Sequence, residues 1–96
     1  TSADSVGDPQ KLQVTLEVDG EVRQDANTSD MMFPVAKLIA YWSPMGLQTG
    51  DILITGTPSG VALAREEPER YYLREGQTVT ARIEKLGEIR NRVVRA

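Results

Sequence analysis

The sequence predicts a small α+β domain that is rich in β-strands, because alternating strand patterns surround a single helical pattern. Residues 12–18 and 78–83 alternate apolar with polar side chains, which is typical of strands with one buried face. Between them, residues 35–42 repeat apolar side chains at the spacing of one helix face. The 96 residues are 40% hydrophobic and 26% charged, which fits one ordinary globular domain rather than a disordered chain.

A β-hairpin is predicted over residues 12–24. One face of its first strand carries the apolar residues Leu12, Val14, Leu16 and Val18. Asp19-Gly20 follows, and this pair suits a type I′ turn because both central positions of that turn need positive φ. Residues 21–24 then return as the second strand.

A helix is predicted over residues 35–42, because apolar side chains fall at positions i, i+3, i+4 and i+7. These side chains are Val35, Leu38, Ile39 and Trp42. Pro34 fits the first turn, where its missing N–H costs no hydrogen bond. Ser43-Pro44 and Gly46 end the helix. We expect the apolar face to meet the core or a partner.

The second half of the chain is predicted to contain three more strands. Residues 51–55 carry three consecutive apolar β-formers and are interpreted as a buried strand. Residues 62–70 are rich in charge and are interpreted as a solvated loop. Residues 78–83 and 88–94 form a second predicted hairpin, with its turn at Leu86-Gly87.

A five-residue pattern, Leu-x-x-Gly-Asp/Gln, occurs at residues 47–51 and again at residues 73–77. Each copy directly precedes a predicted strand, and glycine permits the positive φ that such a turn requires. We therefore expect the same turn twice. Asp51 is expected to accept hydrogen bonds from local backbone N–H groups in the first copy.

The composition excludes several kinds of site. The chain has no cysteine and no histidine, so it cannot assemble Ser-His-Asp or Cys-His catalysis, or a metal site with those ligands. A metal would have to be a hard cation on oxygen ligands. The net charge of −3 argues against general nucleic-acid binding. The longest apolar run is too short to span a bilayer, and no signal peptide is visible.

Residues 54–60, Ile-Thr-Gly-Thr-Pro-Ser-Gly, form the one candidate ligand loop. Its glycines let a ligand approach the backbone, and free N–H groups around Gly56 and Thr57 could hold a carboxylate or a phosphate. The loop matches neither a P-loop nor G-x-G-x-x-G. From spacing alone, a turn that ends a strand remains the simpler interpretation. The acidic run Glu66-Glu67-x-Glu69 is interpreted as solvated rather than as a cation site.

Six stretches spread over residues 7–94 form a wider pattern. They are Gly7–Leu12, Val18–Gln24, Asn27–Phe33, Leu47–Val61, Leu73–Gln77 and Leu86–Val94. The longest contains Gly-Asp-Ile-x-x-Thr-Gly-Thr-Pro-x-Gly-Val. In this order, the stretches resemble the C-terminal portion of the catalytic domain of the fumarylacetoacetate hydrolase family. Gln77 departs from the aspartate that is usual there, which leaves the capping of its turn open.

The resemblance implies a mixed β-roll fold, in which residues 1–96 would be the C-terminal portion of a longer catalytic domain. Family members commonly form homodimers and act on 2-oxo acid or acylpyruvate substrates. They bind Mg²⁺, Mn²⁺ or Ca²⁺, and the cation chelates the oxo acid and stabilises enolate charge. Mg²⁺ is the expected ion here.

The same resemblance implies which site residues this chain contains. The acidic metal ligands of the family, and the His-Glu dyad and lysine of many members, lie upstream of the matching segment. Catalytic and metal-binding residues are therefore expected outside this chain. Only Gly56 and Thr57 carry over, as part of the loop that binds the substrate carboxylate.

Three functions remain open from the sequence. The first is the C-terminal part of a cytoplasmic, metal-dependent enzyme, inactive without its N-terminal portion or a partner chain. The second is a non-enzymatic β-rich module that pairs with another chain, and a longer reading frame upstream would favour the enzyme. The third, an oligonucleotide-binding barrel on the basic residues 82–95, lacks aromatic side chains there for base stacking. The start at Thr1 suggests a processed, tagged or truncated product.

Overall fold

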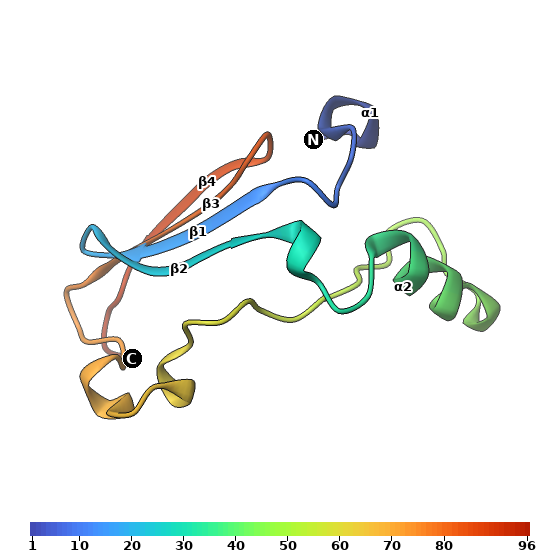
Figure 1. The fold of residues 1–96 in the computed structure, drawn as a ribbon. Helices are drawn as coiled ribbons and strands as arrows, with labels where there is room; N and C mark the ends of the chain where they lie inside the picture. Colours follow the sequence, from blue (N-terminus) through green and yellow to red (C-terminus); the bar gives the residue numbers. More distant parts are fainter.

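A four-stranded antiparallel sheet, in the order β2-β1-β3-β4, organises the chain (Figure 1). The computed structural model describes residues 1–96. Strands β1 (Gln13–Val18) and β2 (Glu21–Asn27) form one hairpin, and β3 (Thr78–Ile83) and β4 (Gly87–Arg92) form the other. Because β1 pairs with β3, the centre of the sheet joins the first and last quarters of the chain.

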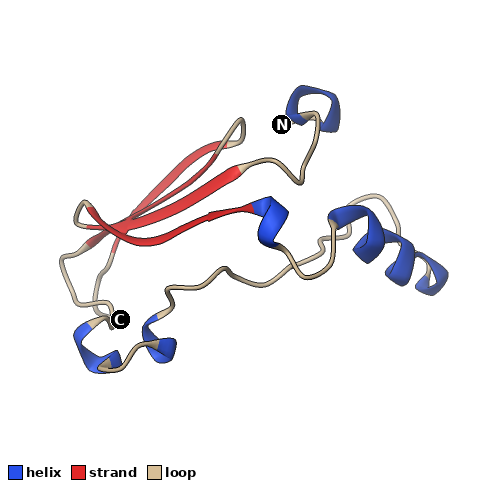
Figure 2. Cartoon of the chain, viewed as in Figure 1, coloured by secondary structure: helices blue, strands red, loops and turns tan.

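One short helix precedes β1, and the other helical segments lie in the long connection between β2 and β3 (Figure 2). They are α1 (Ala3–Val6), α2 (Val35–Trp42) and the 3₁₀ turns η1 (Thr28–Asp30), η2 (Ser43–Met45), η3 (Ala62–Ala64) and η4 (Pro68–Arg70). Helix α2 projects from the sheet, and the chain after it runs back toward β2 (Figure 1).

The first predicted hairpin is confirmed, and its second strand is longer than predicted. Asp19 and Gly20 have φ of 50° and 82°, as the expected turn requires. Strand β2 continues to Asn27 instead of ending at Gln24. Leu16 lies opposite Gln24, whereas the next residue of β1 lies opposite Val22. One extra residue, at position 23, therefore forms a β-bulge in β2.

The two faces of the sheet differ as the alternation predicts. Its inner face carries the apolar residues Val14, Leu16, Val18, Val79, Ala81 and Ile83, which pair across β1 and β3. On the outer face, Arg82 donates hydrogen bonds to Glu88 at 2.6 Å and to Glu17 at 2.8 Å. The bond to Glu88 and the negative charge of Glu17 raise the pKa of Arg82. The inner face is therefore the one whose apolar side chains must be buried away from water.

The predicted helix is confirmed as α2, and Gly46 with φ of 86° follows its last 3₁₀ turn. Pro34 stands immediately before the first helical residue, not within the first turn as predicted. In the second hairpin the turn lies one or two residues earlier than predicted, because Lys85 takes φ of 62° and Gly87 already begins β4. Strand β4 ends at Arg92 rather than at Val94.

The prediction of a buried strand at residues 51–55 is wrong. This segment has no regular secondary structure, and the side chains of Ile52 and Ile54 are 85% and 91% exposed. A strand forms only where a neighbour pairs with its backbone, and no other part of the chain lies beside this one to do so. Residues 51–55 therefore have the apolar pattern of a strand but no neighbouring strand that pairs with them.

The two copies of Leu-x-x-Gly-Asp/Gln do form the same turn. Asp51 Oδ2 accepts a hydrogen bond from the backbone N–H of Gln48 at 2.8 Å, as predicted. In the second copy, Gln77 Oε1 accepts from the backbone N–H of Arg74 at 2.7 Å. The amide oxygen of Gln77 therefore makes the bond that a carboxylate makes in the first copy, and the turn is capped.

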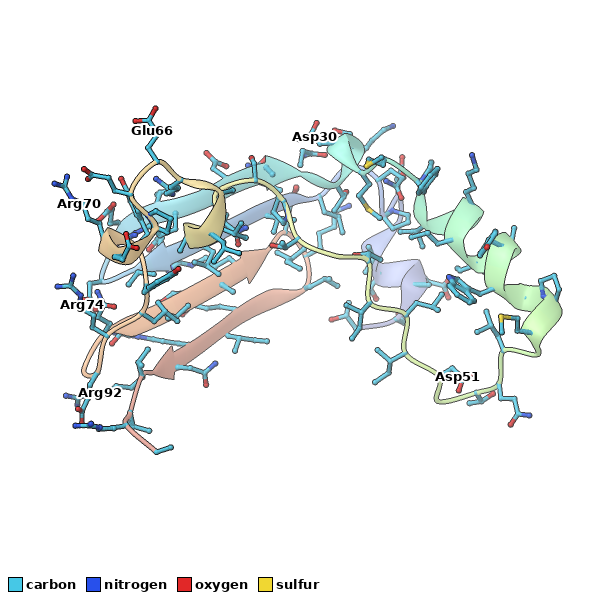
Figure 3. The ribbon with its side chains drawn as sticks, turned by 90° about the horizontal axis from the view of Figure 1, so that it is seen from below. Asp30, Asp51, Glu66, Arg70, Arg74 and Arg92 are labelled. Carbon is cyan, nitrogen blue, oxygen red and sulfur yellow. The ribbon has the colours of Figure 1, made fainter.

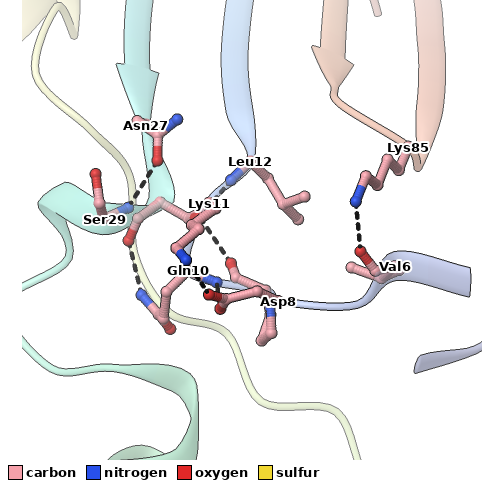
Figure 4. Close-up of polar contacts among 10 residues, drawn as sticks. Val6, Asp8, Gln10, Lys11, Leu12, Asn27, Ser29 and Lys85 are labelled. Atoms are coloured by element: carbon pink, nitrogen blue, oxygen red, sulfur yellow. Dashed lines mark hydrogen bonds and ion pairs between the residues drawn. The ribbon is translucent and has the colours of Figure 1, made fainter. Parts of the chain in front are cut away.

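The N-terminal segment ties the sheet to helix α2. Gln10 Nε2 donates to the carbonyl oxygen of Thr28 at 2.8 Å, and its Oε1 accepts from the backbone N–H of Val35 at 2.6 Å. Lys85 Nζ donates to the carbonyl oxygen of Val6 at 3.0 Å (Figure 4). These bonds hold the start of α2 and the β3–β4 turn against the segment that precedes β1.

The Asp8 carboxylate closes the turn after α1. It accepts from the backbone N–H of Gln10 at 3.0 Å and pairs with Lys11 Nζ at 3.3 Å (Figure 4). These contacts lower the pKa of Asp8. Their contribution to stability is complete above the unfolded pKa and is lost as the pH falls through the lower folded pKa.

The chain buries little of its apolar surface. Only Val6, Leu12, Val18 and Thr80 are buried. The radius of gyration is 15.7 Å, against about 12.5 Å for a compact domain of this length. The exposed area is 7665 Å², about 2,000 Å² more than a compact monomer of this mass shows. An excess of this size, about 2,000 Å², is what obligate protein interfaces bury.

The apolar face of α2 shares this exposure. Ile39 and Trp42, predicted to meet a core or a partner, are 46% and 40% exposed. None of the helices is both long enough and apolar enough to cross a membrane.

We expect the isolated 96-residue chain to unfold without a cooperative transition and to bind the apolar dye ANS, because apolar side chains of α2, of residues 52–54 and of β4 are exposed. Circular dichroism during heating, together with ANS fluorescence, checks this expectation. A sharp two-state transition of a monomer that binds no dye would contradict it.

Candidate functional site

A cavity of about 640 Å³ lies over the inner face of β1 and β2, between two segments that are distant in sequence. Residues 30–33, with Asn27 and Thr28, form one wall, and residues 55–59 form the other. The predicted ligand-binding residues Gly56 and Thr57 both line it. Tertiary folding thus brings together two of the sequence stretches that carry the family resemblance.

The backbone N–H groups of the loop have no hydrogen-bond acceptors within the chain. From Ile52 to Gly60, no backbone N–H group donates a hydrogen bond within the chain. Gly56 has φ of 91°, a conformation that other residues rarely adopt. Unpaired N–H groups beside a left-handed residue favour an anion, and the Thr57 hydroxyl adds a further donor. The arrangement fits the binding of a carboxylate.

The loop is fastened to β2 by contacts that the sequence analysis did not predict. Gln24 Nε2 donates to Thr57 Oγ1 at 3.0 Å and to the carbonyl oxygens of Pro58 at 2.8 Å and Ser59 at 3.3 Å. Gly60 lies so close to β2 that a Cβ atom there would stand 2.2 Å from the carbonyl oxygen of Arg23. We call these contacts of residues 57–60 with β2 the loop clamp.

Arg65 extends the loop clamp, although the sequence predicts a solvated loop at residues 62–70. Its Nη2 donates to the Arg23 carbonyl oxygen at 3.0 Å. The guanidinium groups of Arg65 and Arg23 lie 4.2 Å and 4.9 Å from the ring centroid of Tyr71. The prediction is therefore wrong for Arg65, which is half-buried, while Glu66, Glu67 and Arg70 are exposed. Figure 3 shows Glu66 and Arg70 pointing away from the sheet.

The cavity has one polar side and one apolar side. The loop of residues 55–59 offers hydroxyl and backbone groups, whereas Met31, Met32, Phe33 and Leu38 offer apolar surface. The inner-face residues Val14, Ala26 and Ile83 form its floor. A small molecule with a carboxylate at one end and an apolar body fits this division.

The residues of this chain do not fit a divalent cation. No group of three histidine, cysteine, aspartate or glutamate side chains is close enough to hold a metal ion. Asp30 lines the cavity, but its Oδ2 already accepts from the backbone N–H of Asn27 at 3.2 Å in a capping box. Asp30, Asp51 and Glu66 lie in separate parts of the molecule (Figure 3). The shape and donors of the site fit an anion, and its one carboxylate, Asp30, does not make a metal site by itself.

Comparison with known proteins points to one family. The family profile described as Fumarylacetoacetate (FAA) hydrolase C-terminal matches residues 1–94. A protein from Burkholderia multivorans is 52% identical over 86 residues, which are 88% of this chain and 30% of that protein. This chain therefore spans about a third of the length of such relatives.

Solved enzyme structures share the fold. Fumarylacetoacetate hydrolase from Exiguobacterium antarcticum has a TM-score of 0.91 at 33% identity, over 100% of this chain and 34% of that chain. Maleylpyruvate hydrolase from Sphingobium sp. SYK-6 has a TM-score of 0.85 at 36% sequence identity, and the match covers 100% of this chain and 33% of that chain. Fumarylpyruvate hydrolase from Pseudomonas aeruginosa, in complex with Mn²⁺ and pyruvate, has a TM-score of 0.82 at 34% sequence identity. The match covers 98% of this chain and 37% of that chain. The predicted fold class is confirmed.

Gly60→Ala is expected to release the loop from β2, because its Cβ would collide with the Arg23 carbonyl oxygen. Gly50→Ala is the matched control: φ at Gly50 is +101°, close to the +104° of Gly60, but nothing lies within 4 Å of the added Cβ. It carries only the backbone strain, about 1 kcal/mol or more. Cleavage by proteinase K within residues 55–60 should become several-fold faster in Gly60→Ala alone. Equal cleavage rates in both variants would contradict the loop clamp.

Proposed function

The chain belongs to the fumarylacetoacetate hydrolase family, and we propose that residues 1–96 are the C-terminal portion of a single catalytic domain acting on 2-oxo acids of the acylpyruvate type. The reaction is C–C bond hydrolysis, decarboxylation, isomerisation or a lyase reaction. One observation carries the proposal: Gly56 and Thr57, from the most specific family stretch, line a cavity with unpaired N–H groups around them.

The part of this chain in the reaction is to hold and orient the substrate. The Thr57 hydroxyl and neighbouring backbone N–H groups bind the carboxylate, which fixes one end of the molecule. The apolar wall at Met31, Phe33 and Leu38 receives the acyl portion. Charged hydrogen bonds to neutral donors strengthen when water is excluded, so the site acts fully only when the open side of the cavity is covered.

A divalent cation belongs to the proposal but not to these residues. The pyruvate-bound relative from Pseudomonas aeruginosa contains Mn²⁺, which supports a divalent ion beside the oxo acid. We propose Mg²⁺, with Mn²⁺ and Ca²⁺ as alternatives, held by residues outside 1–96. No proton transfer is assigned to this chain: the one carboxylate that lines the cavity, Asp30, accepts a hydrogen bond from the backbone N–H of Asn27 in a capping box.

The uncovered surface supports two partners in the proposal. The exposed apolar side chains of α2 and of residues 52–54 lie against the remainder of the same catalytic domain, or against a partner chain that supplies it. The complete enzyme forms a homodimer in the cytoplasm. The excess exposed area of this chain is large enough for both contacts.

Thr57→Val in the complete enzyme is expected to raise KM for a 2-oxo acid substrate, or to lower kcat/KM, by about tenfold or more, because a hydrogen bond to a charged group is lost. Thr57→Ser keeps the hydroxyl and should stay within a few-fold of wild type. Steady-state kinetics check both variants. Unchanged kinetics in Thr57→Val would remove the assignment of the loop to the substrate.

Metal removal separates the complete enzyme from this chain. EDTA is expected to abolish turnover by the complete enzyme, and Mg²⁺ or Mn²⁺ to restore it. The isolated 96-residue chain should bind no Mn²⁺ in a calorimetric titration, because it lacks a cluster of ligands. Tight Mn²⁺ binding by the isolated chain would contradict the placement of the ligands elsewhere.

A further inference from the structure

We propose that Gln24 is a positioning residue for the carboxylate-binding loop, and that it sets the direction in which the Thr57 hydroxyl donates. This inference rests on the proposed function and extends it to a residue of the neighbouring sheet. Gln24 does not line the cavity, so its effect on a ligand would pass through the loop.

The orientation of the Gln24 amide follows from its partners. The carbonyl oxygens of Pro58 and Ser59 can only accept hydrogen bonds, and they lie 2.8 Å and 3.3 Å from Nε2. The NH₂ group must therefore face the loop, because the opposite orientation would set the amide oxygen against two carbonyl oxygens. The same Nε2 also reaches Thr57 Oγ1 at 3.0 Å.

The role of the Thr57 hydroxyl follows in turn. The Nε2 group of Gln24 can donate but cannot accept, so Thr57 Oγ1 is the acceptor in this contact. The single hydroxyl proton is then left without a partner inside the chain. Since Thr57 lines the cavity, that proton is available to an anion there. Gln24 thus makes the hydroxyl a donor for the ligand instead of a free rotor.

The β-bulge explains why Gln24 can reach the loop at all. In an unbroken hairpin register, Arg23 would lie opposite Leu16 on the inner face, and Gln24 would face outward. The extra residue puts Gln24 opposite Leu16 instead. A polar amide thus stands on an apolar face, where it needs hydrogen-bond partners, and the loop carbonyls provide them. Arg65 also holds the bulge, because its Nη2 donates to the Arg23 carbonyl oxygen.

The test uses the complete, metal-loaded enzyme and four proteins: wild type, Gln24→Met, Thr57→Val and the double variant. Methionine keeps the length of the side chain without its N–H groups. Gln13→Met is the matched control, because Gln13 is a strand glutamine whose amide bonds Asp25 and not the loop. The probe is pyruvate, whose dissociation constant is measured by calorimetry. Cleavage by proteinase K within residues 55–60 and hydrogen exchange of the β1–β2 hairpin are measured on the same samples.

Gln24→Met is expected to weaken pyruvate binding about tenfold and to add no further loss in the Thr57→Val background, because it acts through that hydroxyl. Cleavage within residues 55–60 should become faster, while the amides of the hairpin stay protected from exchange. Gln13→Met should change neither. Additive losses in the double variant, or unchanged cleavage within residues 55–60, would overturn the positioning role.

Two further outcomes are distinguishable. If Gln24→Met also loses protection of the hairpin, Gln24→Asn, which keeps an amide but is one methylene shorter, replaces it; a pyruvate affinity equal to wild type in that variant overturns the proposal. If wild type binds no pyruvate, the proposed function fails. The rate of proteinase K cleavage within residues 55–60 then decides by itself whether Gln24 positions the loop.

Discussion

The loop clamp is the contact on which the candidate site depends. A single extra residue at Arg23 changes which side chain of β2 faces inward, and Gln24 then bonds three consecutive residues of the loop. The loop that these bonds hold forms one wall of the cavity. Because Gly60 has no room for a side chain against β2, the loop cannot shift along the strand without losing these bonds. The position of the loop, and with it the shape of the cavity, therefore depends on its contacts with β2.

The chemistry of the cavity follows from what the loop clamp leaves unused. Residues 55–57 keep their backbone N–H groups free, and no lysine or arginine lines the cavity. An anion would thus be held by oriented neutral donors, which discriminate by geometry more than by charge. Such donors gain strength when solvent is removed. Covering the open surface around the cavity would therefore strengthen the binding of an anion by the loop.

Local signals in the sequence predicted most of the secondary structure. Asp19-Gly20 forms the expected turn, Val35 to Trp42 forms the expected helix, and Asp51 caps its own turn. Each depends on residues within a few positions of one another. The prediction of Gly56 and Thr57 as ligand residues came from the family resemblance, and the structure places both at a cavity. Their binding role stays a prediction.

The sequence by itself therefore determined the hairpins, the helix, the turns and the family, because these depend on local backbone preferences and on motif order. Only the tertiary structure decided that residues 51–55 are not a strand, that Gln24 faces the loop and that Arg65 is held against β2. The physical reason is that each depends on a partner far along the chain. A strand needs a neighbour for its backbone, and a half-buried amide or guanidinium needs acceptors that no local pattern reveals.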